Sequence, residues 1–402
     1  METRVIQDNL SYASDVIQRG GLVAVPTETV YGLAGSGLNE EAVHRIYEVK
    51  GRPAVKPLSL MVPDASAFSL YGVDVPKQAK VLADRYWPGP LTIVVKARES
   101  IPAIVLAGGS SVGLRCPDHP LTLSLLRACG LPLAAPSANL SGQESPKNAQ
   151  QVLSYFDGVI DCVIDGGPCG IGKESTIIDL SATPFRILRQ GALPAEEIAQ
   201  TLADDMTVIG VTGGSGAGKT TALIALEELG AKVIDCDALY HELLQRSKPM
   251  LDELEAAFPG TVKDETLDRR ALSEIVFSDP EALLCLNRIT HRYVRQAVAD
   301  RLGCFAMQGC TLAAVDAAEL IAGGLRERCS ATIAVIADEQ LRTSRIMARD
   351  GISLEKARQR IRAQKPDLYF YENCDHILVN NADPESFLED CRRLLKEILQ
   401  HG

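Results

Sequence analysis

Short apolar runs recur along the second half of the chain, separated by stretches long enough for helices. The runs lie at residues 208–211, 232–234, 311–315, 332–336 and 376–379. Continuous apolar runs of this length are typical of strands that are buried on both faces of a parallel sheet. Their alternation with helical stretches predicts an α/β domain in which helices flank a parallel sheet.

The first half has a less regular pattern, which predicts a mixed α/β domain. Strands are expected at residues 22–25 and 91–95, and helices at residues 39–48 and 120–129. Between the halves, residues 191–207 predict a short polar helix and then a joint directly before the first apolar run of the second half.

The length of the chain also favours two domains. A chain of 402 residues is longer than one core usually supports, and 46% hydrophobic residues are enough to fill a core in each half. We therefore expect domains at residues 1–203 and 204–402.

Charge and cysteine content exclude some classes of protein. The net charge is −11, divided about evenly between the halves, so we expect no broad nucleic-acid-binding surface. None of the 11 cysteines falls in a C-x-x-C pair or has zinc spacing, which suits free thiols in a reducing compartment. With no signal peptide and no apolar run of about 20 residues, the expected location is cytoplasmic, without a membrane.

One motif in the second half has a specific chemical meaning. It fits G-x-x-x-x-G-K-[ST] and consists of Gly213, Gly214, Ser215, Gly216, Ala217, Gly218, Lys219 and Thr220, with Thr221 following. Such a loop between a strand and a helix turns its N–H groups toward phosphate oxygens. We expect it to bind ATP, with Lys219 at the β- and γ-phosphates and the Thr220 hydroxyl on Mg²⁺. The alternative is a glycine-rich turn with a surface lysine.

Acidic residues end two of the predicted strands. Asp235 and Asp237 follow the run at 232–234, and Asp316 follows the run at 311–315. Carboxylates at this edge of a parallel sheet can accept a proton from an attacking hydroxyl or hold Mg²⁺. Asp237 can equally be a helix N-cap, and Asp316 an ordinary acid at a strand end.

Arg345 and Arg349 lie four residues apart on a predicted helix, so they share a face. They could clamp phosphates, or they could belong to a solvated arginine face.

Taken together, residues 206–402 resemble dephospho-CoA kinase. The resemblance implies transfer of the ATP γ-phosphate to the ribose 3′-hydroxyl of dephospho-CoA, with Asp237 as the base and Asp235 and Arg269 at the substrate. The sequence departs from the family pattern at Glu319 and Ala322, where an apolar residue and an acid are expected, and at Arg292, where proline is expected. A nucleotide-binding regulator and a kinase for another acceptor therefore stay open as alternatives.

In the first half, polar clusters lie at strand ends and in loops. Lys50, Arg52 and Lys56 place three cations within seven residues, and Arg115 ends a predicted strand. Cations held in this way can bind a triphosphate or a carboxylate, although the first can instead complement a helix dipole. The loop at 136–142 is rich in small polar groups, which is also ordinary turn chemistry.

In order, these clusters resemble the threonylcarbamoyl-AMP synthase (YrdC-like) family over residues 10–193, which implies a twisted open α/β sheet. The implied reaction combines L-threonine, bicarbonate and ATP, and other proteins of the pathway then transfer the group to a tRNA adenosine. The resemblance assigns the polar tetrad to Lys50, Arg52, Ser137 and Asn139. It places at ATP the residues Arg52, Lys56, Ser111, Asn139, Lys147 and Arg189. It places at threonine the residues Thr29, Arg115, Ser137 and Ser175.

A nucleic-acid-binding module is the competing interpretation of the first half. The acidic balance and the few aromatic residues disfavour it, and salt-dependent RNA binding would identify it.

Overall fold

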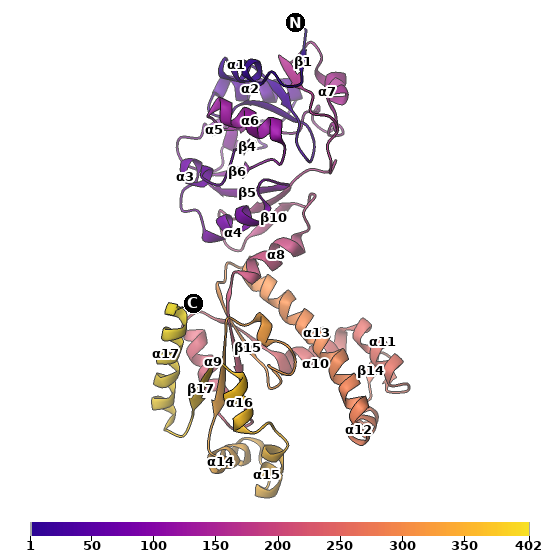
Figure 1. Cartoon of the computed structure of the whole chain (residues 1–402), viewed down its shortest axis with the longest axis vertical. Helices are drawn as coiled ribbons and strands as arrows, with labels where there is room; N and C mark the ends of the chain where they lie inside the picture. Colours follow the sequence, from indigo (N-terminus) through magenta and orange to yellow (C-terminus); the bar gives the residue numbers. More distant parts are fainter. Residues whose placement is uncertain (1, 402) are drawn as a thin grey trace. The chain divides into compact units, whose positions relative to one another are not determined.

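The structure, a computed structural model, describes residues 2–401. The chain forms two compact units. One contains residues up to 202 together with Met307–Gly309, and the other contains Ala203–Ala306 together with residues from 310 onward. Each unit is built from a sheet and the helices that cover it (Figure 1).

The N-terminal unit is built on a mixed sheet. From one edge to the other, its strands are β1 (Arg4–Ile6), β8 (Cys162–Ile164), β2 (Val23–Val25), β3 (Gly32–Ser36), β7 (Leu133–Ala134), β4 (Ser59–Met61), β6 (Ser111–Arg115), β5 (Leu91–Lys96), β9 (Thr176–Asp179) and β10 (Arg186–Arg189). Its helices are α1 (Leu10–Gln18), α2 (Glu40–Lys50), α3 (Ala67–Tyr71), α4 (Lys77–Tyr86), α5 (Ala103–Leu106), α6 (Pro120–Cys129) and α7 (Ala149–Phe156), with α8 (Ala195–Asp204) at the boundary between the units.

Helix α2 places a candidate site residue, Lys50, toward the middle of this sheet. Its start is fixed by Asn39, whose side chain accepts hydrogen bonds from the backbone N–H groups of Glu41 and Ala42. Its end is fixed by Gly51, which adopts the left-handed conformation at φ +56°. The helix therefore stops at Lys50, a residue that is 3% exposed.

The C-terminal unit has a five-stranded sheet that is parallel throughout. Its strand order is β12 (Lys232–Asp235), β15 (Leu312–Asp316), β11 (Thr207–Thr212), β16 (Ala331–Ile336) and β17 (His376–Val379). The helices are α9 (Lys219–Glu228), α10 (Cys236–Arg246), α11 (Lys248–Ala257), α12 (Arg269–Ser278), α13 (Pro280–Met307), α14 (Glu339–Asp350), α15 (Leu354–Arg362), α16 (Asp367–Asn373) and α17 (Pro384–His401). A short 3₁₀ helix (Arg326–Arg328) and a hairpin of β13 (Val262–Lys263) and β14 (Thr266–Leu267) complete it.

Alternate residues of the central strands face opposite layers of helices. Ile333 and Val335 of β16 are buried in a core shared with Phe387 of α17, whereas Ala334 and Ile336 form a separate cluster with Phe370 of α16. Figure 1 shows α9 and α17 beside each other and α16 apart from them. The prediction of a parallel sheet flanked by helices is confirmed. Each face of these strands is apolar, so helices pack against both faces.

Helix α10 begins earlier than predicted. It starts at Cys236, and the Asp235 carboxylate accepts hydrogen bonds from the backbone N–H groups of Asp237 and Ala238. Asp235 is therefore the N-cap, and the interpretation of Asp237 as the cap is wrong. Asp237 lies in the first turn of the helix, where its side chain is left for other contacts.

The glycine loop between β11 and α9 depends on backbone conformations that side chains rarely adopt. Gly213 and Gly218 have φ values of +137° and +104°. A Cβ atom on Gly213 would lie 2.2 Å from the carbonyl oxygen of Val335, and one on Gly218 would lie 2.0 Å from Nδ2 of Asn380. The loop thus lies directly against the end of β16 and against the residue that follows β17.

Within residues 2–401, no helix is both long enough and apolar enough to cross a membrane.

We expect Gly218→Ala to destabilise the C-terminal unit more than Gly230→Ala does. Both glycines have positive φ, so each substitution carries a backbone cost of about 1–2 kcal/mol. Only at position 218 does the new methyl group meet a neighbour within 4 Å, which adds about 1–3 kcal/mol. Hydrogen exchange in β11 and α9, measured by mass spectrometry, reports this difference. Equal losses of protection in the two variants would contradict it.

Candidate active sites

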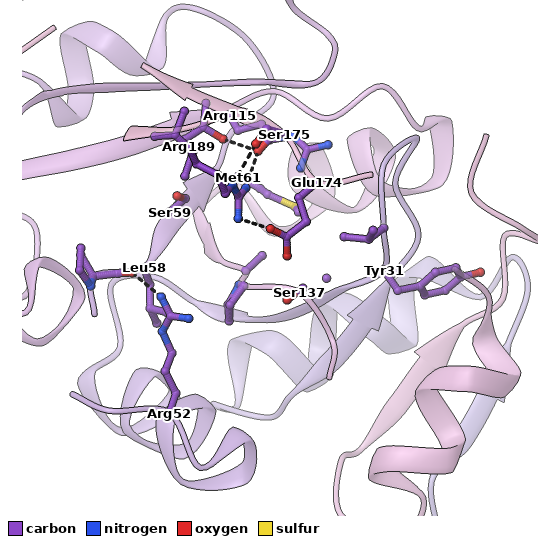
Figure 2. Close-up of a pocket in the computed structure, with 17 residues that line it drawn as sticks. Tyr31, Arg52, Leu58, Ser59, Met61, Arg115, Ser137, Glu174, Ser175 and Arg189 are labelled. Atoms are coloured by element: carbon purple, nitrogen blue, oxygen red, sulfur yellow. Dashed lines mark hydrogen bonds and ion pairs between the residues drawn. The ribbon is translucent and has the colours of Figure 1, made fainter. Parts of the chain in front are cut away.

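A pocket of about 160 Å³ lies over the middle of the N-terminal sheet (Figure 2). Arginines reach it from three segments: Arg52 from the loop after α2, Arg115 from the end of β6 and Arg189 from the end of β10. In Figure 2, Arg189 and Glu174 point toward each other, and Arg52 lies across the pocket from them. The remaining lining residues are Val30, Tyr31, Gly32, Pro57, Leu58, Ser59, Met61, Thr92, Ala135, Pro136, Ser137, Ser175 and Ile177.

The turn that precedes β3 holds the side chain of Arg115 in place. Its Nη2 donates to Oε1 of Glu28 and to Oγ1 of Thr29, both at 2.7 Å. Thr27 fixes this turn by accepting hydrogen bonds from the backbone N–H groups of Thr29 and Val30. The Nε of Arg115 is buried and has no partner within residues 2–401. A ligand carboxylate could bind Nη1, for which these contacts leave both N–H donors open.

Arg189 is positioned by residues at the start of β9. Its Nε donates to the carbonyl oxygen of Ser175 and its Nη2 to Oγ of Ser175, both at 3.1 Å. The Ser175 hydroxyl also shares a hydrogen bond of 2.9 Å with that of Thr92 on β5. An ion pair between Nη1 and the Glu174 carboxylate completes the set. Burial lowers the pKa of Arg189, and Glu174 opposes this.

Lys50 joins α2 to the loop at 136–142. Its ammonium group donates to the carbonyl oxygens of Ser137 and Asn139, and the backbone N–H of Ser141 donates back to the carbonyl of Lys50 at 2.8 Å. Burial lowers the pKa of Lys50 to about 8, and the positive charge of Arg52 acts in the same direction. The hydroxyl of Ser137 donates to Oδ1 of Asn139 at 2.6 Å. All four members of the predicted tetrad therefore lie in one connected region.

The other predicted residues lie at varying distances from the pocket. Thr29, Lys50 and Asn139 contact pocket residues without lining it themselves. Lys56 is exposed, although its carbonyl oxygen accepts a hydrogen bond of 3.3 Å from Nε of Arg52. Ser111 begins β6, and Lys147 lies 3.7 Å from the carboxylate of Glu144. The side chains of Lys56, Ser111 and Lys147 do not line the pocket.

Sequence reasoning gave no role to several lining residues. Glu174 precedes the predicted Ser175 and is the one carboxylate among the residues that line the pocket. A charged residue next to a predicted binding serine was the available signal. Tyr31, Ser59, Met61 and Thr92 come from strands and turns whose pocket-facing side only the fold reveals.

In the C-terminal unit, acidic residues meet Lys219 at the carboxyl end of the sheet. Asp235 and Asp316 pair in register on neighbouring strands, and Nζ of Lys219 lies 3.6 Å from Oδ1 of Asp316. Burial raises the pKa of the Asp316 carboxyl, and Asp235 and Asp237 raise it further against the opposing charge of Lys219.

This arrangement fits a divalent cation. Oδ1 of Asp316 is buried and has no hydrogen-bond partner in the described part of the chain. A buried carboxylate oxygen that accepts no hydrogen bond and lies 3.6 Å from the Lys219 ammonium, beside further negative charge, is a ligand type that Mg²⁺ prefers. Asp316 and the exposed Thr220 would hold such an ion.

One predicted arginine contacts the glycine loop and the other does not. Nη1 of Arg345 donates to the carbonyl oxygens of Gly216 and Ala217 at 3.4 and 3.5 Å. Arg349 instead binds the carboxylate of Asp350, its neighbour in the chain, at 2.7 and 3.0 Å. Sequence reasoning missed Arg342, a buried residue of the same helix whose Nε donates to the carbonyl oxygen of Ser215 at 3.1 Å.

A second pocket of about 230 Å³ lies between α10, α13 and the turn after β15. Asp237, His291 and Glu319 line it, whereas the exposed Ala322 does not. Burial lowers the pKa of His291, and the charge of Glu319 opposes this. Arg269 begins α12, and its charge lowers the pKa of the pocket residue Tyr240, which burial raises. The pocket thus offers acid–base groups at the same end of the sheet as the glycine loop.

We predict that the stability of the N-terminal unit rises with pH because of Lys50. Its pKa is 10.5 in an unfolded chain and about 8 in the fold, so the unfolded chain binds more protons between these values. Stability should therefore increase by roughly 3 kcal/mol across this range. Urea unfolding followed by the fluorescence of Trp87, the single tryptophan, reports on this unit.

Comparison with Lys50→Met at each pH removes the contribution of other titrating groups. The stability difference between the two proteins should shift in favour of the wild type as the pH rises, and a difference independent of pH would contradict the buried ammonium.

Two family models match the chain. The Sua5/YciO/YrdC model, described as telomere recombination, matches residues 15–191, and the dephospho-CoA kinase model, CoaE, matches residues 207–385.

Curated relatives match the N-terminal half. The threonylcarbamoyl-AMP synthase of Pyrococcus abyssi is 44% identical over 201 residues, which are 50% of this chain and 59% of that protein. The chain thus spans little more than half the length of this relative. The putative threonylcarbamoyl-AMP synthase of Methanocaldococcus jannaschii is 36% identical over 191 residues, 48% of this chain and 89% of that protein.

Among solved structures, P. abyssi Sua5 complexed with L-threonine is 30% identical, with 82% of this chain and 96% of that chain covered at a TM-score of 0.49. A likeness at this score adds nothing to the sequence matches. The resemblance of the first half is confirmed by its family model and by the relatives, and that of the second half by its family model. The chain belongs to the Sua5/YciO/YrdC family through its N-terminal unit, and its C-terminal unit matches the dephospho-CoA kinase model.

Proposed function

We propose that this chain is a bifunctional enzyme with an ATP site in each half, residues 1–203 and 204–402. The N-terminal half makes threonylcarbamoyl-AMP from L-threonine, bicarbonate and ATP. The C-terminal half phosphorylates the ribose 3′-hydroxyl of dephospho-CoA.

The convergence of Arg52, Arg115 and Arg189 on one pocket is the observation that supports the synthase proposal. Threonine, bicarbonate and a triphosphate are all anionic or carry an anionic group, so a pocket with fixed cations lowers the cost of bringing them together. Arg115 would take the amino-acid carboxylate, with Thr29, Ser137 and Ser175 around threonine.

ATP would lie toward the opposite cations of this pocket. Arg52 and Arg189 would offset charge on the phosphates, and Lys56, Ser111, Asn139 and Lys147 complete the proposed set. Lys56, Ser111 and Lys147 require closure of their segments onto the nucleotide, because their side chains do not line the pocket of the free protein. Lys50 would act with Arg52 by holding the loop that carries Ser137.

For the C-terminal half, the glycine loop beside Asp316 supports ATP binding, and the adjoining pocket supports an acceptor. N–H groups of residues 213–221 would bind the phosphates, with Lys219 at the transferred group and Arg345 behind the loop. Arg349 would need to leave Asp350 to reach the nucleotide. Mg²⁺ held by Thr220 and Asp316 would neutralise phosphate charge.

Asp237 is the proposed base because it lines the acceptor pocket and its helix cap is supplied by Asp235. Asp235, as that cap, and Arg269 would border the acceptor. Glu319 in the same pocket favours one alternative, a kinase whose acceptor differs from dephospho-CoA, since a carboxylate there would repel an anionic group of the acceptor. A nucleotide-binding regulator is the other alternative.

We propose a cytoplasmic location. Other proteins of the pathway would carry out transfer to tRNA, since the acidic chain offers no broad basic surface.

The kinase proposal predicts ADP formation from MgATP and dephospho-CoA without threonine. Lys219→Ala should reduce this rate at least about 100-fold, because the lysine would no longer stabilise charge on the transferred phosphate. The matched control is Lys232→Ala, which removes an exposed lysine from β12 in the same unit and should leave the rate unchanged. If ATP binds but dephospho-CoA elicits no ADP, the C-terminal half is a regulator or acts on another acceptor.

A further inference from the structure

The N-terminal pocket contains an ion pair that opposes the binding of an anion. Three arginines line this pocket, and the single lining carboxylate, Glu174, is bonded to one of them, Arg189. Neither side chain is deeply buried, since 35% of Glu174 and 39% of Arg189 are exposed. The pair is therefore close enough to solvent for one partner to move.

The contacts around this pair show which partner can move. Arg189 is fixed by two further hydrogen bonds to Ser175, one to the carbonyl oxygen and one to Oγ. Besides the ion pair, the Glu174 carboxylate accepts one hydrogen bond, from Oγ of Ser145 at 3.0 Å. The backbone of Glu174 is held in place, because its carbonyl accepts from the N–H of Ala192 at 2.8 Å. Rotation of the Glu174 side chain alone would free the arginine.

Freeing Arg189 changes what it can offer a ligand. A guanidinium has five N–H donors, and three of those on Arg189 are used by Ser175 and Glu174. While the carboxylate stays in place, its charge also cancels much of the attraction that a phosphate would feel. An anion that replaces the carboxylate gains both a donor and an unopposed cation.

We propose that Glu174 is an internal counter-anion, which holds Arg189 in place in the empty pocket and is displaced when a polyphosphate binds. The identification of that polyphosphate as ATP rests on the proposed function; the displacement itself does not. Departure of the carboxylate also removes the acceptor of the Ser145 hydroxyl, whereas the backbone of Lys147, two residues later, stays held by Cys169 and Gln151.

Inorganic triphosphate is the probe for this displacement. It is titrated into the full chain in a calorimeter. Every protein in the comparison carries Lys219→Ala, which weakens binding of triphosphate to the glycine loop. Glu174→Gln keeps the size of the side chain and a hydrogen-bond acceptor but removes the charge, and it should bind triphosphate about threefold more tightly, as expected for an ion pair exposed to this degree.

Two further variants make the test specific. Glu99→Gln removes an equal charge from an exposed turn and should change nothing. In the background of Arg189→Ala, the Glu174→Gln substitution should give a smaller gain, because the cation that it releases is absent, and an undiminished gain would contradict the proposal. The fluorescence of Trp87 during urea unfolding verifies that each variant is folded. Unchanged or weaker binding by Glu174→Gln, or no triphosphate binding by any of the proteins, would overturn the proposal.

An assay of pyrophosphate release from ATP distinguishes failure of this inference from failure of the proposed function. If release requires threonine and bicarbonate, Glu174→Gln should lower the KM for ATP and leave the KM for threonine unchanged, which a purely structural role would not produce. If no pyrophosphate is released while triphosphate binding follows the expected pattern, the synthase proposal fails and the internal counter-anion stands. Release of pyrophosphate with identical triphosphate affinities would refute the counter-anion alone.

Discussion

The buried ammonium of Lys50 is the interaction on which the N-terminal pocket depends. A charged amine away from water is costly unless its protons are bonded, and the carbonyl oxygens of Ser137 and Asn139 accept them. These bonds join the end of α2 to the loop at 136–142, so the helix stop at Gly51 and the position of the Ser137 hydroxyl are set together. The same burial that lowers the pKa of Lys50 therefore organises the side of the pocket that faces Arg52.

The two units provide different groups for binding an anion. In the N-terminal unit, side-chain cations converge on the pocket, and carboxylates such as Glu28 and Glu174 balance them. In the C-terminal unit, the glycine loop leads into the N-terminus of α9, and a helix N-terminus is favourable for an anion. Fixed donors that need no rearrangement on binding are what an enzyme requires to stabilise developing charge.

Much of the fold could be predicted from the sequence because apolar periodicity reports burial directly. The strands of the second half were found in this way, and β17 has the predicted bounds, His376–Val379. The start of α10 was missed because an Asp-x-Asp sequence offers two possible caps, and only the backbone conformation selects Asp235.

The candidate sites were predictable where a motif fixes geometry, as in the loop at 213–220. They were not predictable where a contact joins distant segments. Arg342 supports the loop through Ser215, 127 residues away, and Arg349 is held by its neighbour Asp350 although it shares a helix with Arg345. Helical spacing places side chains on a face but does not say which partner will hold them.

The most direct test of two chemistries on one chain is a ³¹P NMR time course of this chain with MgATP, L-threonine, bicarbonate and dephospho-CoA together. The account predicts resonances of ADP and of a new ribose 3′-phosphate from one half, and of pyrophosphate and a threonylcarbamoyl adenylate from the other. Pyrophosphate without ADP, or ADP without pyrophosphate, would show that one of the two halves does not perform the reaction assigned to it.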